Sequence, residues 1–150
     1  MKNNEKKVVG SENKTREKTV SGVRYSSNSK TPIWLFDNLD RTGKFAFDLE
    51  RKDFNYKEFL SKMISYSNMT WGEILRQTHD DGKSKHHILS PDTISKDAIK
   101  SIEKKQLIDN VGCVFSFAFQ NKLRIIGLKD DEFFHVIWYD PNHEFSVVKK

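Results

Sequence analysis

The residues with the most varied chemistry in this sequence are its five histidines, three of which stand close together in a polar segment. His79, His86 and His87 share this segment with Asp80 and Asp81. Histidine and carboxylate side chains can together bind a divalent metal or transfer a proton. However, these histidines have no recognised ligand spacing, and a metal site needs ligands that are held in position. We therefore expect a solvated loop here and no metal site.

A second candidate group lies near the C-terminus, where Asp140, His143 and Glu144 share a proline-containing turn. His135 lies on the apolar segment that precedes this turn. A histidine beside a carboxylate at the end of a strand can act as a general acid or base, so His143 is the candidate catalytic residue. The alternative is a structural turn in which Asp140 binds backbone amides and His143 is merely exposed.

Lys122 and Arg124 are the candidate nucleic-acid-binding residues. A cation on the face of a strand can stabilise the charge that develops on phosphorus during RNA cleavage. The alternative is an ordinary exposed polar face, because Arg124 alternates with Leu123 and Ile125 as in a half-buried strand.

The single cysteine and the tryptophans favour structural roles. Cys113 opens an apolar segment and has no adjacent histidine or basic residue, so we expect it to pack. Trp71 and the pair Trp138-Tyr139 could stack on bases, although burial in a core is the commoner role of such residues. One cysteine also excludes a disulfide scaffold or a multi-cysteine zinc site within one chain.

The first half of the chain predicts a β-hairpin followed by helices. Apolar and alternating residues predict strands over residues 33–36 and 44–49, joined by turn residues 40–43. The next segment predicts a helix whose buried face carries Tyr56, Phe59, Leu60, Met63 and Ile64.

Two further helices have recognisable first residues. Thr70 and Glu73 have the spacing of a capping box, which predicts a short helix. Ser95 has the position of an N-cap, and its helix has a buried stripe made of Ala98, Ile99, Ile102 and Leu107.

After Gly112 the apolar period changes from that of a helix to that of a strand. Residues 113–119, 123–128 and 133–139 predict an antiparallel meander, and residues 145–148 predict a fourth, edge strand. The expected fold is therefore α+β: an N-terminal β-hairpin, two or three helices, then an antiparallel three- to four-stranded meander with helices on one face.

Composition limits the class of protein. Of 150 residues, 36% are hydrophobic and 31% charged, and no segment has the ~20 apolar residues of a membrane-spanning helix. The first residues lack the apolar core of a secretory signal. We expect a cytoplasmic protein that has no membrane partner.

The net charge of +5 lies entirely in residues 1–30, which contain eight basic and three acidic residues. Residues 1–31 are also poor in apolar side chains, and we expect a disordered basic tail and linker there. Residues 32–150 form the single expected α+β domain. Because that domain is neutral overall, charge alone predicts nucleic-acid binding only for the tail.

Residues 121–139, NKLRIIGLKDDEFFHVIWY, resemble the C-terminal strands of the RelE/ParE toxin superfamily. Shared features are a basic residue before two aliphatics, an acidic turn and an apolar central strand. The resemblance implies an mRNA endonuclease or a gyrase inhibitor that is paired with an antitoxin, and it implies a phosphate contact for Arg124. Just past the central strand, many members of the superfamily have a basic residue followed by a tyrosine. This chain has residues 140–144 at that place, and His143 would supply the acid–base chemistry there.

The leading hypothesis is a toxin-like small bacterial domain that acts on RNA or the translation machinery. Its RNA cleavage would use the 2′-hydroxyl of the RNA, so no cofactor is expected. The alternative is a non-enzymatic protein-binding module encoded by a phage or mobile element, because residues 138–144 resemble uncharacterised proteins of prophages and mobile elements. The neutral charge of the domain favours this alternative. Metal-dependent chemistry at the histidine segment ranks last.

Overall fold

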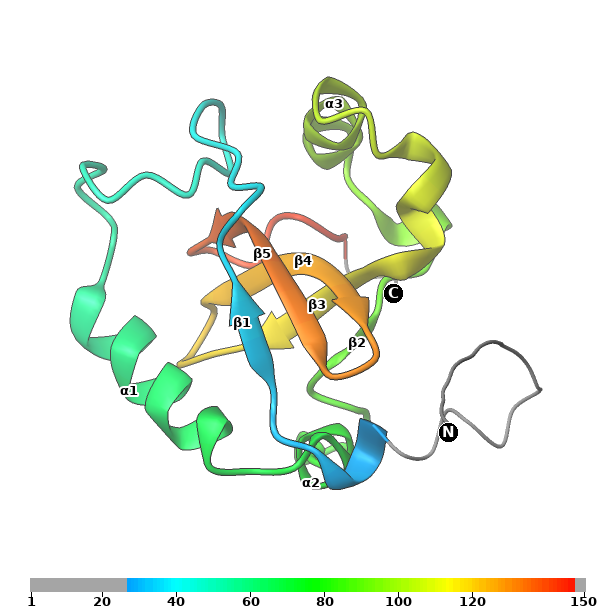
Figure 1. The fold of residues 1–150 in the computed structure, drawn as a ribbon. Helices are drawn as coiled ribbons and strands as arrows, with labels where there is room; N and C mark the ends of the chain where they lie inside the picture. Colours follow the sequence, from blue (N-terminus) through cyan, green and yellow to red (C-terminus); the bar gives the residue numbers. More distant parts are fainter. Residues whose placement is uncertain (1–26, 148–150) are drawn as a thin grey trace, which may run out of the picture.

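A five-stranded mixed sheet forms the centre of the computed structural model, which describes residues 27–147 (Figure 1). The strand order is β1-β5-β4-β3-β2. The strands are β1 (Ile33–Leu35), β2 (His87–Ile88), β3 (Val114–Ala118), β4 (Arg124–Asp130) and β5 (Phe133–Asp140). Strands β3, β4 and β5 form the expected antiparallel meander, and the α+β class is confirmed.

The helices begin where the sequence signals predict. They are α1 (Tyr56–Ser67), α2 (Trp71–Leu75) and α3 (Lys96–Lys104), with short 3₁₀ helices η3 (Pro91–Thr93) and η4 (Ile108–Cys113). Thr70 and Glu73 form a complete capping box, and the Ser95 side chain accepts a hydrogen bond from the Ala98 amide. These contacts satisfy amide groups that have no partner inside a helix.

Helices cover both faces of the sheet, not one face as the sequence suggested (Figure 1). On one face, α1 and α2 pack against Phe117 and Phe134 in the first core. On the other face, α3 packs against Ile126 and Trp138 in the second core. Every residue of β3 is buried, as expected for a strand that is covered on both sides.

The expected N-terminal hairpin does not form. Strand β1 instead pairs in parallel with β5, with Ile33 opposite Phe133. Residues 44–49 form no strand, and Ala46 makes a single bridge to Trp138. The Tyr139 amide donates to the Phe45 carbonyl at 3.0 Å, so this segment also follows β5. Both segments lie along the long apolar strand β5, which is distant from them in the sequence. The turn residues between the two segments therefore could not predict this arrangement.

The expected fourth strand of the meander is also absent. In its place, the described residues of this segment make one bridge, between Ser146 and Ile94. The outer position beside β3 is taken by β2, whose residue His87 lies opposite Ser116.

The exposed face of α1 differs from the predicted one. Tyr56, Leu60 and Ile64 are 51%, 55% and 64% exposed, whereas Phe59 and Tyr66 are buried. The Tyr66 hydroxyl donates to the Ala118 carbonyl, so it anchors the helix to the end of β3. Three of the five residues assigned to the buried face therefore form an exposed apolar stripe.

The predicted tail lies largely outside the described residues, because residues 1–26 and 148–150 are not described. Residues 27–31, which the sequence analysis placed in the same segment, are folded. Ser27 is buried, and the Lys30 carbonyl accepts a hydrogen bond from the Trp71 amide at 2.8 Å. Among residues 27–147, no helix is long and apolar enough to cross a membrane.

Candidate functional site

The ends of β3, β4 and β5 meet at one corner of the sheet. Arg124, the first residue of β4, lies opposite both Ala118 on β3 and Asp140 on β5. His87 lies opposite Ser116, two residues before Ala118, so it belongs to the same face of the sheet as Arg124. We use the name sheet corner for the group His79, His87, Lys122, Arg124 and His143.

Arg124 is the buried member of the sheet corner. It is only 7% exposed, and its Nη1 atom donates to the carbonyls of Asn121 and Leu123 at 2.8 and 3.1 Å. Burial lowers the pKa of Arg124, while the charge of Asp140 opposes this shift. The expectation of an exposed arginine was wrong, because its alternation with apolar residues directs it to a second covered face. Arg124 fixes the β3–β4 turn and supplies a positive charge at a defined place.

Asp140 has the structural role that the sequence offered as the alternative. Its Oδ1 and Oδ2 atoms accept hydrogen bonds from the amides of Glu144 and Phe145 at 2.9 and 2.8 Å. Burial raises the pKa of Asp140, and these two bonds act in the opposite direction. Both oxygens therefore hold the turn that carries His143, whose φ is +58°. Within residues 27–147, Asp140 makes no hydrogen bond to His143.

His143 is half-buried and lies within the electrostatic influence of Arg124 and Lys122. Burial is the largest cause of its lowered pKa, and the charges of Arg124, His79, His87 and Lys122 lower it further. His143 therefore carries a neutral imidazole at neutral pH, the form that a general base requires. The structure thus brings together His143, Arg124 and Lys122, which the sequence analysis selected separately.

His79 and His87 also belong to this group, although the sequence analysis assigned them to a solvated loop. Both side chains are exposed, yet His87 is anchored on β2. Burial of its ring lowers the pKa of His87, with a further contribution from Arg124. The sequence identifies the histidine-containing segment as a candidate. It does not predict the pairing of β2 with β3, because a strand of two residues has no recognisable pattern.

His86 is a core residue and not part of a solvated loop. It is 2% exposed, and its ring packs against Tyr66 and Phe117. The Ala118 amide donates to Nδ1 at 3.0 Å, so Nε2 carries the proton and donates to Gln77 Oε1 at 2.8 Å. Burial lowers the pKa of His86 to about 3. Its role is therefore structural.

The remaining candidates lie apart from the sheet corner. His135 Nδ1 lies 3.3 Å from Asp37 Oδ1, where β5 pairs with β1. Trp71 and Trp138 are fully buried, which confirms core packing. Cys113, by contrast, is exposed, so the expectation that it packs was wrong.

In chemical terms, the sheet corner combines two exposed histidines, a half-buried neutral histidine, an exposed lysine and a buried arginine. Such a group can bind an oxyanion and exchange protons with it. No three His, Cys, Asp or Glu side chains of residues 27–147 are placed to hold a metal ion. Comparison with protein-family models, curated proteins and solved structures finds no match for this chain.

Proposed function

We propose that this protein binds RNA at the sheet corner and cleaves it without a metal, as a toxin-like domain. The observation that carries the proposal is the strand register that places Arg124 opposite Asp140, three residues before His143, with Lys122 two residues before Arg124. These residues come from a turn and from the start of β4, and a second exposed histidine, His87, lies on the same face. The resemblance of β4 and β5 to RelE/ParE toxins supports the same function and an antitoxin as partner.

The proposed reaction uses the 2′-hydroxyl of the RNA as nucleophile. Neutral His143 accepts the 2′-hydroxyl proton while the 2′-oxygen forms a bond to phosphorus. The bond from phosphorus to the 5′-oxygen breaks, and this leaving oxygen takes a proton from a water molecule. The proton held by His143 then neutralises the hydroxide that is formed, which returns His143 to its neutral form. Lys122 binds the phosphate directly, whereas buried Arg124 stabilises the developing negative charge through its field.

RNA cleavage by purified protein tests this proposal directly. His143→Ala should lower the cleavage rate by about 10²–10⁴-fold, the usual contribution of a proton-transfer group. His135→Ala is the matched control, because His135 lies away from the sheet corner beside Asp37. Equal losses in both variants, or no cleavage by the wild type with or without ribosomes, would contradict the proposal.

The second candidate function is a non-enzymatic protein-binding module. The exposed apolar stripe of α1, formed by Tyr56, Leu60 and Ile64, favours it. Contiguous exposed apolar residues commonly mark interaction sites. If expression arrests growth, the double variant Leu60→Gln/Ile64→Gln distinguishes the two functions. Arrest that is lost in this variant but kept in His143→Ala would favour the binding module.

A further inference from the structure

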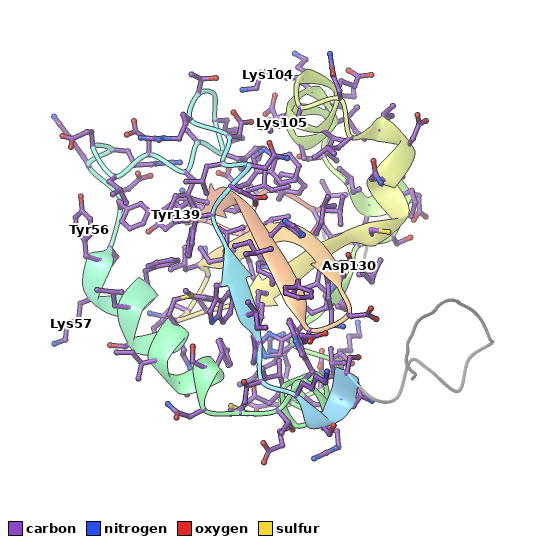
Figure 2. The ribbon with its side chains drawn as sticks, in the orientation of Figure 1. Tyr56, Lys57, Lys104, Lys105, Asp130 and Tyr139 are labelled. Atoms are coloured by element: carbon purple, nitrogen blue, oxygen red, sulfur yellow. The ribbon has the colours of Figure 1, made fainter. Side chains whose placement is uncertain are left out.

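A cavity with a volume of about 860 Å³ runs along the β2 edge of the sheet. Its wall includes apolar side chains of Leu75, Ile88 and Phe115. His87, a member of the sheet corner, lines it as well, and Asp130 is also part of its wall. Figure 2 labels Asp130 at the end of β4. The cavity thus combines an apolar wall with a histidine at one end and with two carboxylates, Asp130 and Asp131, beside Lys129 at the other.

The sheet register gives the distance between these two polar groups. His87 is level with Ser116, and Val114 is level with Leu128, which lies two residues before Asp130. His87 and Asp130 are therefore four positions apart along the strands, roughly 14 Å, and two strands apart across the sheet, roughly 10 Å, so their Cα atoms lie about 17 Å from each other. The His87 and Asp130 side chains span part of this separation, and the space that remains between them matches one nucleotide, from its phosphate to the far edge of its base.

We propose that this cavity binds a single guanine nucleotide, with the base between the apolar side chains and its Watson–Crick edge toward Asp130. Guanine presents two neighbouring donors, N1–H and the N2 amino group, and a carboxylate can accept both in a bidentate pair. Uracil presents one donor between two carbonyl oxygens, which a carboxylate repels. The unstacked bases of single-stranded RNA expose this edge for recognition.

The orientation of the bound nucleotide follows from the charges at the two ends of the cavity. With the base at Asp130, the phosphate lies at the His87 end, beside the positive sheet corner. This inference rests on the proposed function in one respect: the bound guanosine would be part of the RNA substrate and would lie next to the phosphate that is cleaved. Binding of the free nucleotide, however, is measurable without any cleavage.

Cys113 provides the readout. It is the only cysteine of the chain, it is exposed, and it lines this cavity. We would measure its reaction with a thiol reagent in the presence of GMP, AMP, CMP, UMP or inorganic phosphate. With a Kd near 1 mM for GMP, about 5 mM GMP should slow the reaction roughly sixfold, and UMP or phosphate should slow it less than twofold.

Two variants separate base recognition from simple charge effects. Asp130→Asn should abolish the preference for GMP over UMP. Asp109→Asn is the matched control, because Asp109 is an exposed carboxylate four residues before Cys113 that does not line the cavity. The control should keep the GMP preference even if it changes the basal rate of the thiol.

Three outcomes would overturn the inference: no protection by any nucleotide, equal protection by all four, or a GMP preference that survives Asp130→Asn. The proposed function fails separately. If GMP protects Cys113 selectively but RNA is not cleaved, the nucleotide site stands and the nuclease does not. If RNA is cleaved through His143 without GMP protection, the nuclease stands and this cavity is not its base site.

Discussion

Gly127 and His135 approach so closely across the β4–β5 ladder that a Cβ atom on Gly127 would lie 1.9 Å from the His135 carbonyl oxygen. The register between these strands shifts at this point, between Ile126 and Gly127. The bulge allows two consecutive residues of β5, Ile137 and Trp138, to reach the second core. Glycine at position 127 is therefore required by close backbone approach.

Gly127→Ala should destabilise the fold by about 3 kcal/mol or more, because the backbone of β5 must move to relieve the clash. The matched control is Gly112→Ala, where an added Cβ meets no atom within 4 Å. The control should change the free energy of unfolding by less than about 0.5 kcal/mol. Urea denaturation of both variants checks this. Similar midpoints would show that the strands do not approach as described.

Stability should decrease as the pH falls from about 6.5 to about 3, because of His86. Its pKa is about 3 in the folded state and 6.5 in the absence of burial, so the unfolded chain binds more protons throughout this range. The contribution of neutral His86 is complete above pH 6.5 and amounts to a few kcal/mol, which is lost progressively below that value.

Urea denaturation at pH 7, 5 and 4 measures this dependence, and His86→Gln should make it less steep. His87 and His143 have pKa shifts in the same direction, so part of the slope will remain in the variant. If the free energy of unfolding depends equally steeply on pH in the wild type and in His86→Gln, then burial does not prevent the protonation of His86.

Arg124→Ala should lower stability by about 2–3 kcal/mol, because the buried guanidinium donates two hydrogen bonds and its charge favours the ionised form of the buried Asp140 carboxyl. The turn carbonyls of Asn121 and Leu123 also lose their donor. Lys122→Ala should cost less than about 0.5 kcal/mol, since this side chain is exposed. Thermal melts of both variants test the contrast, and equal midpoints would contradict the burial of Arg124.

This contrast also decides which variant can report on RNA binding. A loss of activity in Arg124→Ala has two possible causes, unfolding and loss of a phosphate contact. Lys122→Ala keeps the fold, so a weaker affinity for RNA in that variant would identify a phosphate contact.

Substitutions on α1 should distinguish its two faces. Phe59→Ala should lower stability by about 3–5 kcal/mol, because Phe59 packs in the first core against Phe47 and Phe119. Leu60→Gln and Ile64→Gln should each change stability by less than about 0.5 kcal/mol, because both side chains are exposed in the folded protein. A large loss in Leu60→Gln would place the buried stripe where the sequence pattern predicted it.

Much of the local structure was predictable from neighbouring residues. The capping box of Thr70 and Glu73 and the N-cap Ser95 predicted the starts of α2 and α3, because each contact joins residues only three positions apart. The period of two after Gly112 predicted the meander for the same reason: its strands are joined by short turns. His143 and Lys122 were selected by residue type and local sequence context, and Arg124 also by the resemblance to RelE/ParE strands.

Long-range pairing decided the rest. Strand β1 lies beside β5, whose paired residues are 100 positions further along the chain, and nothing in the local pattern of residues 33–49 indicates this parallel pairing. The same applies to α3, which covers the second face of the sheet. The sheet corner exists only because β2 joins the edge of β3 and brings His87 toward the turn that carries His143. Residue types therefore suggested the chemistry, while the packing of distant strands determined which of those residues meet.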